Sequence, residues 1–164
     1  MRLTALAFLS LLIAACVPAP APLAAQPEPP ELVAFFTGNT SGQGTYRQWL
    51  SGPKPLQVTS QGGMVGDNFQ LDQQIRIEGK APRKRQWIMR PDGKGGWTAS
   101  LTDATGPVEM VRQGHALRIR YEMKNGVKVE QSLRQFDERT IYNRMRFTRF
   151  GLTLARIEER IVKD

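Results

Sequence analysis

The chain has 164 residues, with 23 Lys and Arg, 15 Asp and Glu, and a formal net charge of +8. This length is enough for one globular domain, and a hydrophobic fraction of 40% is too high for a disordered chain. The single Cys and the single His exclude an intrachain disulfide framework and a metal site built on several thiolates or imidazoles. We therefore expect one domain without a metal ion or a cofactor.

The amino-terminal residues predict export and attachment to a membrane. Residues 3–15 carry no charge and follow Arg2, and this stretch is too short to span a bilayer but fits a secretory signal. The junction Leu12-Ile13-Ala14-Ala15-Cys16 resembles the lipobox of bacterial lipoproteins, in which the cysteine receives the lipid. Stable anchoring takes two or more acyl chains. The alternative is ordinary secretion with cleavage after residues 23–25, Leu-Ala-Ala.

A proline-rich segment separates the predicted anchor from the folded domain. Residues 17–30 contain six of the eleven prolines, a composition that favours extended polyproline geometry and a reach of about 40 Å. Val17 stands where many bacterial lipoproteins of the inner membrane have Asp, which predicts an outer-membrane location facing the periplasm. The expected organisation is a signal peptide at 1–15, a lipidated Cys16 with a tether to residue 30, and a folded domain at 31–164.

The folded domain begins with one short helical turn and continues as strands. Leu32, Phe35 and Phe36 share one helical face before Gly38. Four later segments alternate apolar with polar side chains, as strands with one buried and one wet face do. The apolar members of these segments are Phe69, Leu71, Ile75 and Ile77; Leu117, Ile119, Tyr121 and Met123; Val127, Val129 and Leu133; and Ile141, Met145 and Phe147.

Turn residues separate the alternating segments at intervals of roughly ten residues and favour antiparallel connections. Asn125-Gly126 is the strongest hairpin signal and predicts a type I′ turn. The predicted fold is all-β: a single up-and-down antiparallel barrel of about 8–10 strands, of lipocalin size, because closing the sheet removes its edges. An open sandwich is the alternative. The wet faces carry many charged side chains, which excludes a barrel that spans the outer membrane.

The aromatic residues and the single histidine are expected to be structural. We predict that Trp49, Trp87 and Trp97 belong to the core, and that His115 lies in a loop beside Gly114. No second His could act as a base, and no Ser lies in the context of a hydrolase nucleophile. We therefore expect no catalytic residues and a protein that is not an enzyme.

Several polar residues occupy positions in the apolar phase of the strands. A buried amide or guanidinium costs a few kcal/mol unless it is hydrogen-bonded, so these groups must meet one another, water or a ligand. One interpretation is a barrel cavity for an amphipathic molecule with a carboxylate or phosphate; the alternative is an internal network or a position at the rim. The candidate cavity residues are Gln73, Arg85, Trp87, Tyr121, Gln131, Asn143 and Arg149.

The basic residues are concentrated in the carboxyl-terminal half of the domain. Residues 81–164 hold 18 basic and 10 acidic side chains. A basic outer face would be attracted to anionic lipid, while the alternative is a solvated face that keeps the protein soluble. The candidate basic face consists of Arg118, Arg120, Arg144 and Arg146. Nucleic acid is not an expected partner, because the chain is predicted to be exported and its aromatics are not interleaved with basic residues.

Short motifs across residues 35–163 resemble those of a bacterial family designated domain of unknown function 3833, small envelope lipoproteins thought to be lipocalin-like. They are Phe35-Phe36-Thr37-Gly38, residues 40–44 (Thr-Ser-Gly-Gln-Gly), Arg85-Gln86-Trp87, Gly106-Pro107, Gly114 with Leu117 and Tyr121, Asn143-Arg144, and Phe150-Gly151. His115 departs from the Asn expected after Gly114. The resemblance implies a lipocalin-like shape and an envelope location, with no established activity.

Two function hypotheses follow. The first is a lipid-anchored, non-enzymatic binding or carrier module for a small amphipathic or lipid-like molecule. The second is a structural envelope adaptor that docks through its basic face on anionic lipid or on an acidic partner. The interior volume of the barrel separates them, because a filled core favours the adaptor and a cavity favours the binding module.

Overall fold

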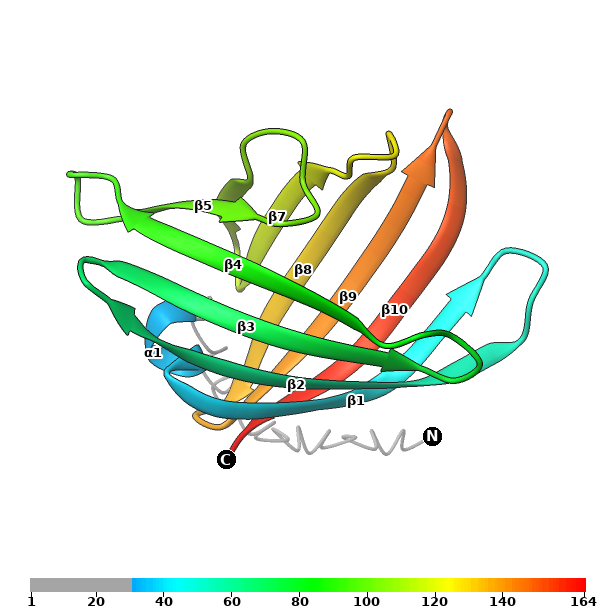
Figure 1. Cartoon of the computed structure of the whole chain (residues 1–164), viewed down its shortest axis with the longest axis horizontal. Helices are drawn as coiled ribbons and strands as arrows, with labels where there is room; N and C mark the ends of the chain where they lie inside the picture. Colours follow the sequence, from blue (N-terminus) through cyan, green and yellow to red (C-terminus); the bar gives the residue numbers. More distant parts are fainter. Residues whose placement is uncertain (1–30) are drawn as a thin grey trace, which may run out of the picture.

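The computed structural model describes residues 31–164, which form one helix and ten strands (Figure 1). The helix α1 spans Leu32–Phe36. The strands are β1 (Gly38–Gln48), β2 (Pro53–Val65), β3 (Asn68–Ile77), β4 (Arg83–Pro91), β5 (Trp97–Leu101), β6 (Glu109–Gln113), β7 (Ala116–Glu122), β8 (Lys128–Asp137), β9 (Thr140–Arg149) and β10 (Leu152–Lys163). The predicted helical turn before Gly38 is confirmed. The ten strands also agree with the predicted number of about 8–10.

The strands form one antiparallel sheet that curls into a nearly closed barrel. Their order is β5-β4-β3-β2-β1-β10-β9-β8-β7-β6, so consecutive strands are neighbours and the first strand also pairs with the last. The two edges are the five-residue strands β5 and β6, linked by a single bridge between Ala99 and Val108. The up-and-down barrel is confirmed rather than the sandwich, but its closure between β5 and β6 is incomplete.

The alternation of apolar and polar residues determines which side chains enter the barrel. On β7, Leu117, Ile119 and Tyr121 are buried while Arg118 and Arg120 between them are exposed. The other strands behave in the same way, because successive side chains of a strand point to opposite faces of the sheet. The buried side chains of all parts of the described chain form one continuous core.

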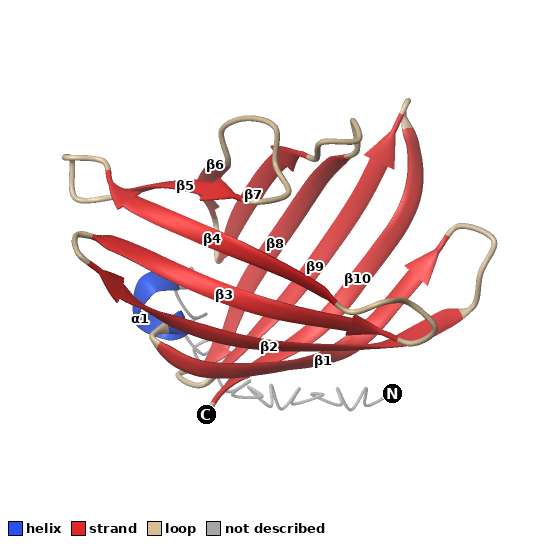
Figure 2. Cartoon of the chain, viewed as in Figure 1, coloured by secondary structure: helices blue, strands red, loops and turns tan. Residues whose placement is uncertain are grey.

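The helix α1 closes one end of the barrel, as Figure 2 shows. Its side chains Leu32, Phe35 and Phe36 are buried in the core. Gly62 of β2 allows this close packing, since an added Cβ would lie 2.1 Å from the carbonyl oxygen of Phe36. We call this the closed end. The opposite end holds the β1–β2, β3–β4, β7–β8 and β9–β10 turns. No helix of residues 31–164 covers it, and we call it the open end.

Two sequence-based expectations are wrong in detail. Asn125-Gly126 does connect β7 to β8, but only Gly126 has a positive φ, so the turn is not type I′. The bonds from Gly126 N–H to the Met123 carbonyl and from Met123 N–H to the Val127 carbonyl define a longer loop that ends in a left-handed glycine. Trp49 is not a core residue: it lies in the β1–β2 turn and is exposed.

Residues 31–164 form a continuous sheet around one core, and we therefore expect this segment to fold on its own. Except at the edge between β5 and β6, every strand has hydrogen-bonded neighbours on both sides. The core includes side chains from α1 and from strands across the whole sheet. This segment also has the usual size of a single domain.

Candidate functional site

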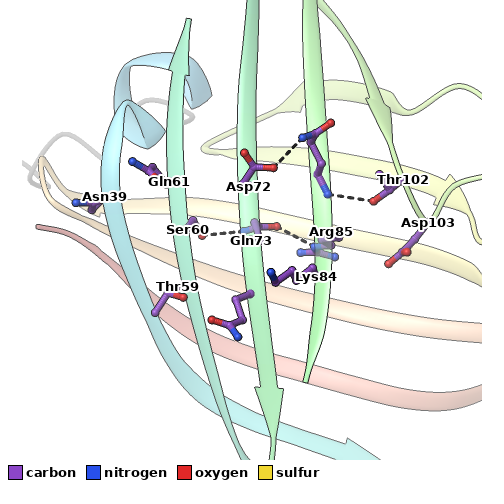
Figure 3. A pocket seen from close by; sticks show the side chains of 12 residues that line it. Asn39, Thr59, Ser60, Gln61, Asp72, Gln73, Lys84, Arg85, Thr102 and Asp103 are labelled. Carbon is purple, nitrogen blue, oxygen red and sulfur yellow. Dashed lines mark hydrogen bonds between the residues drawn. The ribbon is translucent and has the colours of Figure 1, made fainter. Parts of the chain in front are cut away.

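Polar side chains that point into the barrel form a layer across its interior, which we call the polar layer. Its first half lies on β2, β3 and β4. The antiparallel register places Ser60, Gln73 and Arg85 side by side on these strands. The Gln73 amide donates to Ser60 Oγ at 3.0 Å and accepts from Arg85 Nε at 2.8 Å (Figure 3). Its oxygen also accepts from the Trp87 indole at 3.0 Å. Gln73 therefore satisfies three inward-facing polar groups and holds the guanidinium of Arg85 in place.

Two aromatic residues, Trp87 and Tyr121, lie close to Arg85. Its guanidinium carbon lies 5.7 Å from the centre of the Trp87 ring, and Trp87 meets Tyr121 edge to face at 6.0 Å. Burial raises the pKa of the Tyr121 hydroxyl, an effect opposed by the charge of Arg85 and a hydrogen bond from it. Tyr121 is thus a neutral hydroxyl beside a fixed positive charge.

The second half of the polar layer lies across the barrel on β9 and β10. Asn143 and Glu159 are register partners, and the Asn143 amide donates to Glu159 Oε2 at 2.9 Å. Burial raises the pKa of Glu159, while the Asn143 bond and the charge of Arg85 act in the opposite direction. Desolvation is the largest of these effects, so Glu159 takes up a proton more readily than an ordinary carboxyl group.

Two glycines of β1 make room for Glu159. A Cβ at Gly42 would lie 1.9 Å from Glu159 Oε1, and one at Gly44 would lie 2.0 Å from the carbonyl oxygen of Glu158. Gly44 is also the register partner of Glu159. Any larger residue at these positions would displace the buried carboxyl group or push β10 away.

The polar layer divides the interior into two cavities that share Arg85 and Glu159. The larger has a volume of about 280 Å³ and extends toward the open end. Its apolar walls include Val58, Ile75, Val127, Met145, Phe147 and Ile157. This volume is close to the lower end of the ~300–1,000 Å³ typical of ligand pockets. An apolar chamber with a cation, a hydroxyl and a carboxyl group at its inner end is the candidate site.

The smaller cavity, of about 30 Å³, lies beneath α1. Gln131 and Asn143 line it, and the side-chain oxygens of both are buried without a hydrogen-bond partner among residues 31–164. A cavity of this size holds about one water molecule, and a water there would satisfy both acceptors. We expect this cavity to be hydrated rather than to receive an organic ligand.

The rim of the larger cavity is positively charged. Lys80 lies 4.4 Å above the ring of Tyr46 and donates to its hydroxyl at 3.2 Å. Arg83 forms an ion pair with Asp103 at 3.1 Å. With this pair neutral overall, Lys80 and Arg85 leave the cavity with an excess of positive charge, which favours an anionic group.

A broad depression over β1–β4 is larger, at about 740 Å³, and is lined mostly by outward polar side chains, with Ser60, Gln73 and Arg85 at its base. It is less suited to ligand binding. Figure 3 shows its polar side chains. The side-chain amides of Gln70 and Gln86 donate to Asp72 at 2.8 Å and hold the pKa of that carboxyl below its ordinary value. These groups bond to one another on a solvated surface and leave no apolar chamber.

The structure brings together six of the seven residues singled out as cavity candidates. Gln73, Arg85, Gln131 and Asn143, together with Trp87 and Tyr121, line the two cavities. Arg149 does not join them: it is exposed at the end of β9, with its guanidinium carbon 4.9 Å from the ring of Phe150. The pairing of β9 with β8 ends at Thr148, so Arg149 lies beyond it, opposite Leu152 at the β9–β10 turn.

The four arginines of the predicted basic face lie on the outer surface. Acidic neighbours balance three of them: Arg120 lies 3.7 Å from Glu109 and from Glu130, Arg144 lies 3.6 Å from Glu158, and Arg146 also pairs with Glu130. The excess of basic residues in the sequence therefore does not become a uniformly positive face at these positions.

Sequence reasoning missed Ser60, Thr40 and above all Glu159. Glu159 lies between Ile157 and Ile161 in the inward phase of β10, so the rule that identified Gln73 could also have identified it. Thr40 and Ser60 are buried and face one another across β1 and β2, and Thr40 Oγ1 has no hydrogen-bond partner in the described part of the chain. Their strands are rich in glycine and polar residues, which conceals the alternation.

Other predicted features are absent from this site or lie outside the described residues. The predicted lipidation site Cys16 and its tether precede residue 31, where the description begins. His115 is exposed in the turn between β6 and β7. Within residues 31–164 no cluster of His, Cys, Asp or Glu could hold a metal ion. The same residues include no helix long and apolar enough to cross a membrane.

The sheet, its helical plug and its inner polar layer define a lipocalin-like β-barrel domain. A family model described as "Protein of unknown function (DUF3833)" matches residues 10–163, so the chain belongs to this family. The resemblance inferred from the motifs is confirmed. A search of curated proteins found no match.

Two solved structures share the architecture. The S-type phycobiliprotein lyase CPES from Guillardia theta superimposes with a TM-score of 0.62 at 7% identity, over 82% of this chain and 91% of that one. Rv2717c from M. tuberculosis gives a TM-score of 0.56 at 11% identity, over 79% of this chain and 92% of that one. At these identities the likeness shows the fold alone.

Proposed function

We propose that this protein is a non-enzymatic binding module for a small amphipathic molecule that carries a carboxylate or phosphate. The observation that carries the proposal is the cavity of about 280 Å³ with apolar walls and Arg85, Tyr121 and Glu159 at its inner end. The acidic group of the ligand accepts hydrogen bonds from Arg85, and its apolar part extends along Val127, Met145 and Phe147 toward the open end. Small polar sets in apolar chambers are typical of ligand sites.

The charges at the inner end favour an anion over a neutral head group. Gln73 already orients Arg85, so little side-chain freedom is lost on binding. Burial raises the pKa of Glu159 and an approaching anion would raise it further, so binding favours the protonated form of this carboxyl group, which can donate a hydrogen bond. Arg85 and Glu159 would thus bind the same acidic group as cation and neutral donor.

The test uses residues 31–164 with anilinonaphthalene sulfonate as a fluorescent probe, and decanoate and decanol as competitors of equal chain length. Decanoate is expected to displace the probe more strongly than decanol. Arg85→Gln should lower the affinity for decanoate by about tenfold to hundredfold and leave the affinity for decanol almost unchanged, because the substitution removes a charge-assisted hydrogen bond. Arg90→Gln, on the outer face of the same strand, is the matched control.

Equal affinity for decanoate and decanol in the wild type would contradict the proposed anionic ligand. Absence of probe binding, together with no retained mass when lipid extracts are passed over the protein and examined by native mass spectrometry, would contradict the binding function. Vesicle binding that then disappears on charge reversal of Arg118, Arg120, Arg144 and Arg146 would favour the envelope adaptor.

We also propose that the domain is attached to the outer membrane through Cys16 and faces the periplasm. The support is the lipobox-like junction ending at the only Cys of the chain, followed by the proline-rich residues 17–30. Incorporation of labelled palmitate into the full chain, and its loss in Cys16→Ser, is the expected result. Equal labelling of both chains, or cleavage after residue 25, would overturn this localisation.

A further inference from the structure

Two turns at the open end expose apolar side chains to solvent. Trp49 and Leu50 in the β1–β2 turn are 59% and 92% exposed, and Phe150 and Leu152 at the β9–β10 turn are 88% and 54% exposed. The turns are neighbours, because β1 pairs with β10 and the Trp49 N–H bonds to the Leu154 carbonyl at 2.8 Å. We call these four side chains the apolar tips. Turns are normally polar, so such a cluster indicates an interaction surface.

The backbone of the apolar tips argues against a purely structural role. Leu50 has a φ of +61° and Phe150 a φ of +51°, and they are the only residues other than glycine with positive φ in the described chain. This left-handed conformation favours Gly or Asn and is strained for bulky side chains. A large apolar residue that is both strained and exposed contributes little to folding. Its presence at both tips points to contact with something outside the chain.

The charges behind the tips indicate the nature of that contact. A row of outward residues crosses five strands in register: Arg120, Glu130, Arg146, Arg156 and Arg47. Acidic neighbours balance the row on β7–β9, but Arg156 and Arg47 face each other, and within residues 31–164 no ion pair joins either of them to an acid. Two like charges directly opposite are unfavourable unless an anion lies between or beside them.

The segments that carry the tips contain no acidic residue. Residues 47–57 include Arg47 and Lys54, and residues 145–157 include Arg146, Arg149 and Arg156, without any Asp or Glu in either segment. Apolar tips backed by unbalanced arginines match the layered chemistry of a lipid bilayer, with anionic phosphates above an apolar interior. A second copy of the same surface would bring these arginines together instead.

We propose that the open end of the barrel docks on an anionic lipid bilayer. The apolar tips enter the boundary between head groups and acyl chains, and Arg47, Arg149 and Arg156 contact lipid phosphates. Gln48 and Leu154 line both the groove beneath the tips and the larger cavity, so docking places the mouth of that cavity at the membrane surface. The docking does not depend on whether the cavity binds a ligand.

The test is co-sedimentation of residues 31–164 with phosphatidylcholine vesicles, with and without phosphatidylglycerol. We expect binding to vesicles that contain phosphatidylglycerol, a decrease with salt, and weak binding to phosphatidylcholine alone. Trp49 provides a second readout, since its fluorescence should shift to the blue on binding and be quenched by brominated lipid. The variant Trp49→Phe should keep the binding and lose most of the shift.

Two double variants test the two components. Leu50→Asn with Phe150→Asn suits the left-handed backbone and should reduce vesicle binding at least about tenfold without loss of folding. Arg47→Gln with Arg156→Gln should reduce it by a similar factor. The matched controls are Phe136→Asn and the pair Arg118→Gln with Arg134→Gln, which alter an exposed aromatic and exposed arginines away from the tips.

Unchanged vesicle binding in the Leu50 and Phe150 variant would overturn the proposal, as would equal binding to vesicles without phosphatidylglycerol. Dimerisation that disappears in the same variant, without vesicle binding in the wild type, would identify a second copy as the occupant and would also overturn it. Displacement of the fluorescent probe by decanoate is measured separately without lipid. Failure of that assay would contradict the binding module and leave the docking result intact.

Discussion

The two ends of the barrel use the same strands in opposite ways. At the closed end, Leu32, Phe35 and Phe36 of α1 fill the interior, and the remaining cavity of about 30 Å³ has room for little more than water. At the open end no helix of the described part of the chain covers the interior, a cavity of about 280 Å³ remains, and the turns expose apolar side chains. The closed end is therefore occupied by packed side chains, while the open end keeps the space and the exposed apolar surface for the ligand and membrane contacts proposed above.

Removing a buried side chain of α1 at the closed end is expected to have the largest effect on stability. Phe36→Ala deletes a buried ring that packs against β2 and should lower the free energy of unfolding by about 3–5 kcal/mol. Chemical denaturation of residues 31–164 measures this loss. The control Phe136→Ala removes an exposed ring and should cost much less. Equal losses in the two variants would mean that α1 is not the main seal of the barrel.

A second experiment addresses the layer between the two ends. In Gly44→Ala the new Cβ would lie 2.0 Å from the Glu158 carbonyl oxygen, a backbone atom that cannot move alone. We expect a loss of about 1–3 kcal/mol from overpacking, measured by thermal or chemical unfolding. Gly63→Ala, with open space around its Cβ, is the control and should have almost no effect. A tolerated Gly44→Ala would contradict the close approach of β1 and β10.

The third prediction concerns the pH dependence that Glu159 imparts to stability. Because burial raises its pKa above the ordinary value of 4.5, the native state holds this proton more tightly than the unfolded chain does. Its contribution to stability is fully present below the ordinary pKa and is lost as the pH rises through the raised pKa. Relative to Glu159→Gln, the wild type should therefore lose stability as the pH rises from the ordinary pKa of this carboxyl group to its raised pKa.

Unfolding curves recorded at several pH values for wild type and Glu159→Gln give this difference directly. The control is Glu158→Gln, which changes the adjacent, exposed carboxyl group that lies 3.6 Å from Arg144. The difference between wild type and Glu159→Gln should grow with pH above the ordinary value, and the control should not show this growth. A difference that is constant with pH would mean that Glu159 titrates normally.

The smallest expected effect lies at the apolar tips and has the opposite sign. Leu50→Asn places a residue that tolerates positive φ where a strained, exposed Leu stands, and should raise stability by about 1 kcal/mol. Leu152→Asn, a neighbouring exposed leucine without positive φ, is the control and should leave the melting temperature nearly unchanged. A destabilised Leu50→Asn would show that Leu50 serves folding after all.

The strands and their inward faces could be predicted because alternation is a local property of the sequence. Leu117, Ile119 and Tyr121 differ so clearly from the charged residues between them that only one face can be buried. The same rule identified Gln73, Arg85 and Asn143 as inward polar residues. It failed at Arg149, since the phase of a strand does not show where pairing with a neighbouring strand ends, and β9 pairs with β8 only as far as Thr148.

The alternation of apolar and polar residues could not predict that β1 pairs with β10. Gly42 and Gly44 have no side chains to show an alternation, and Glu159 is a charged residue that local propensity assigns to the surface. Only the long-range register brings the two glycines under Glu159 and creates the space it occupies. Likewise, Trp49 was predicted to be a core residue because of its type, and only the tertiary structure places its turn at the open end.

By itself, the sequence determined the all-β class, the up-and-down order, the faces of most strands and the family, because these depend on patterns between neighbouring residues. The tertiary structure decided which end is closed, how Arg85 comes to act on a buried Glu159, and which arginines remain unbalanced. Those properties depend on contacts between residues that are distant in the sequence, such as Arg85 and Glu159, or Arg47 and Arg156. No local pattern records such contacts, because they arise only when the first and last strands pair.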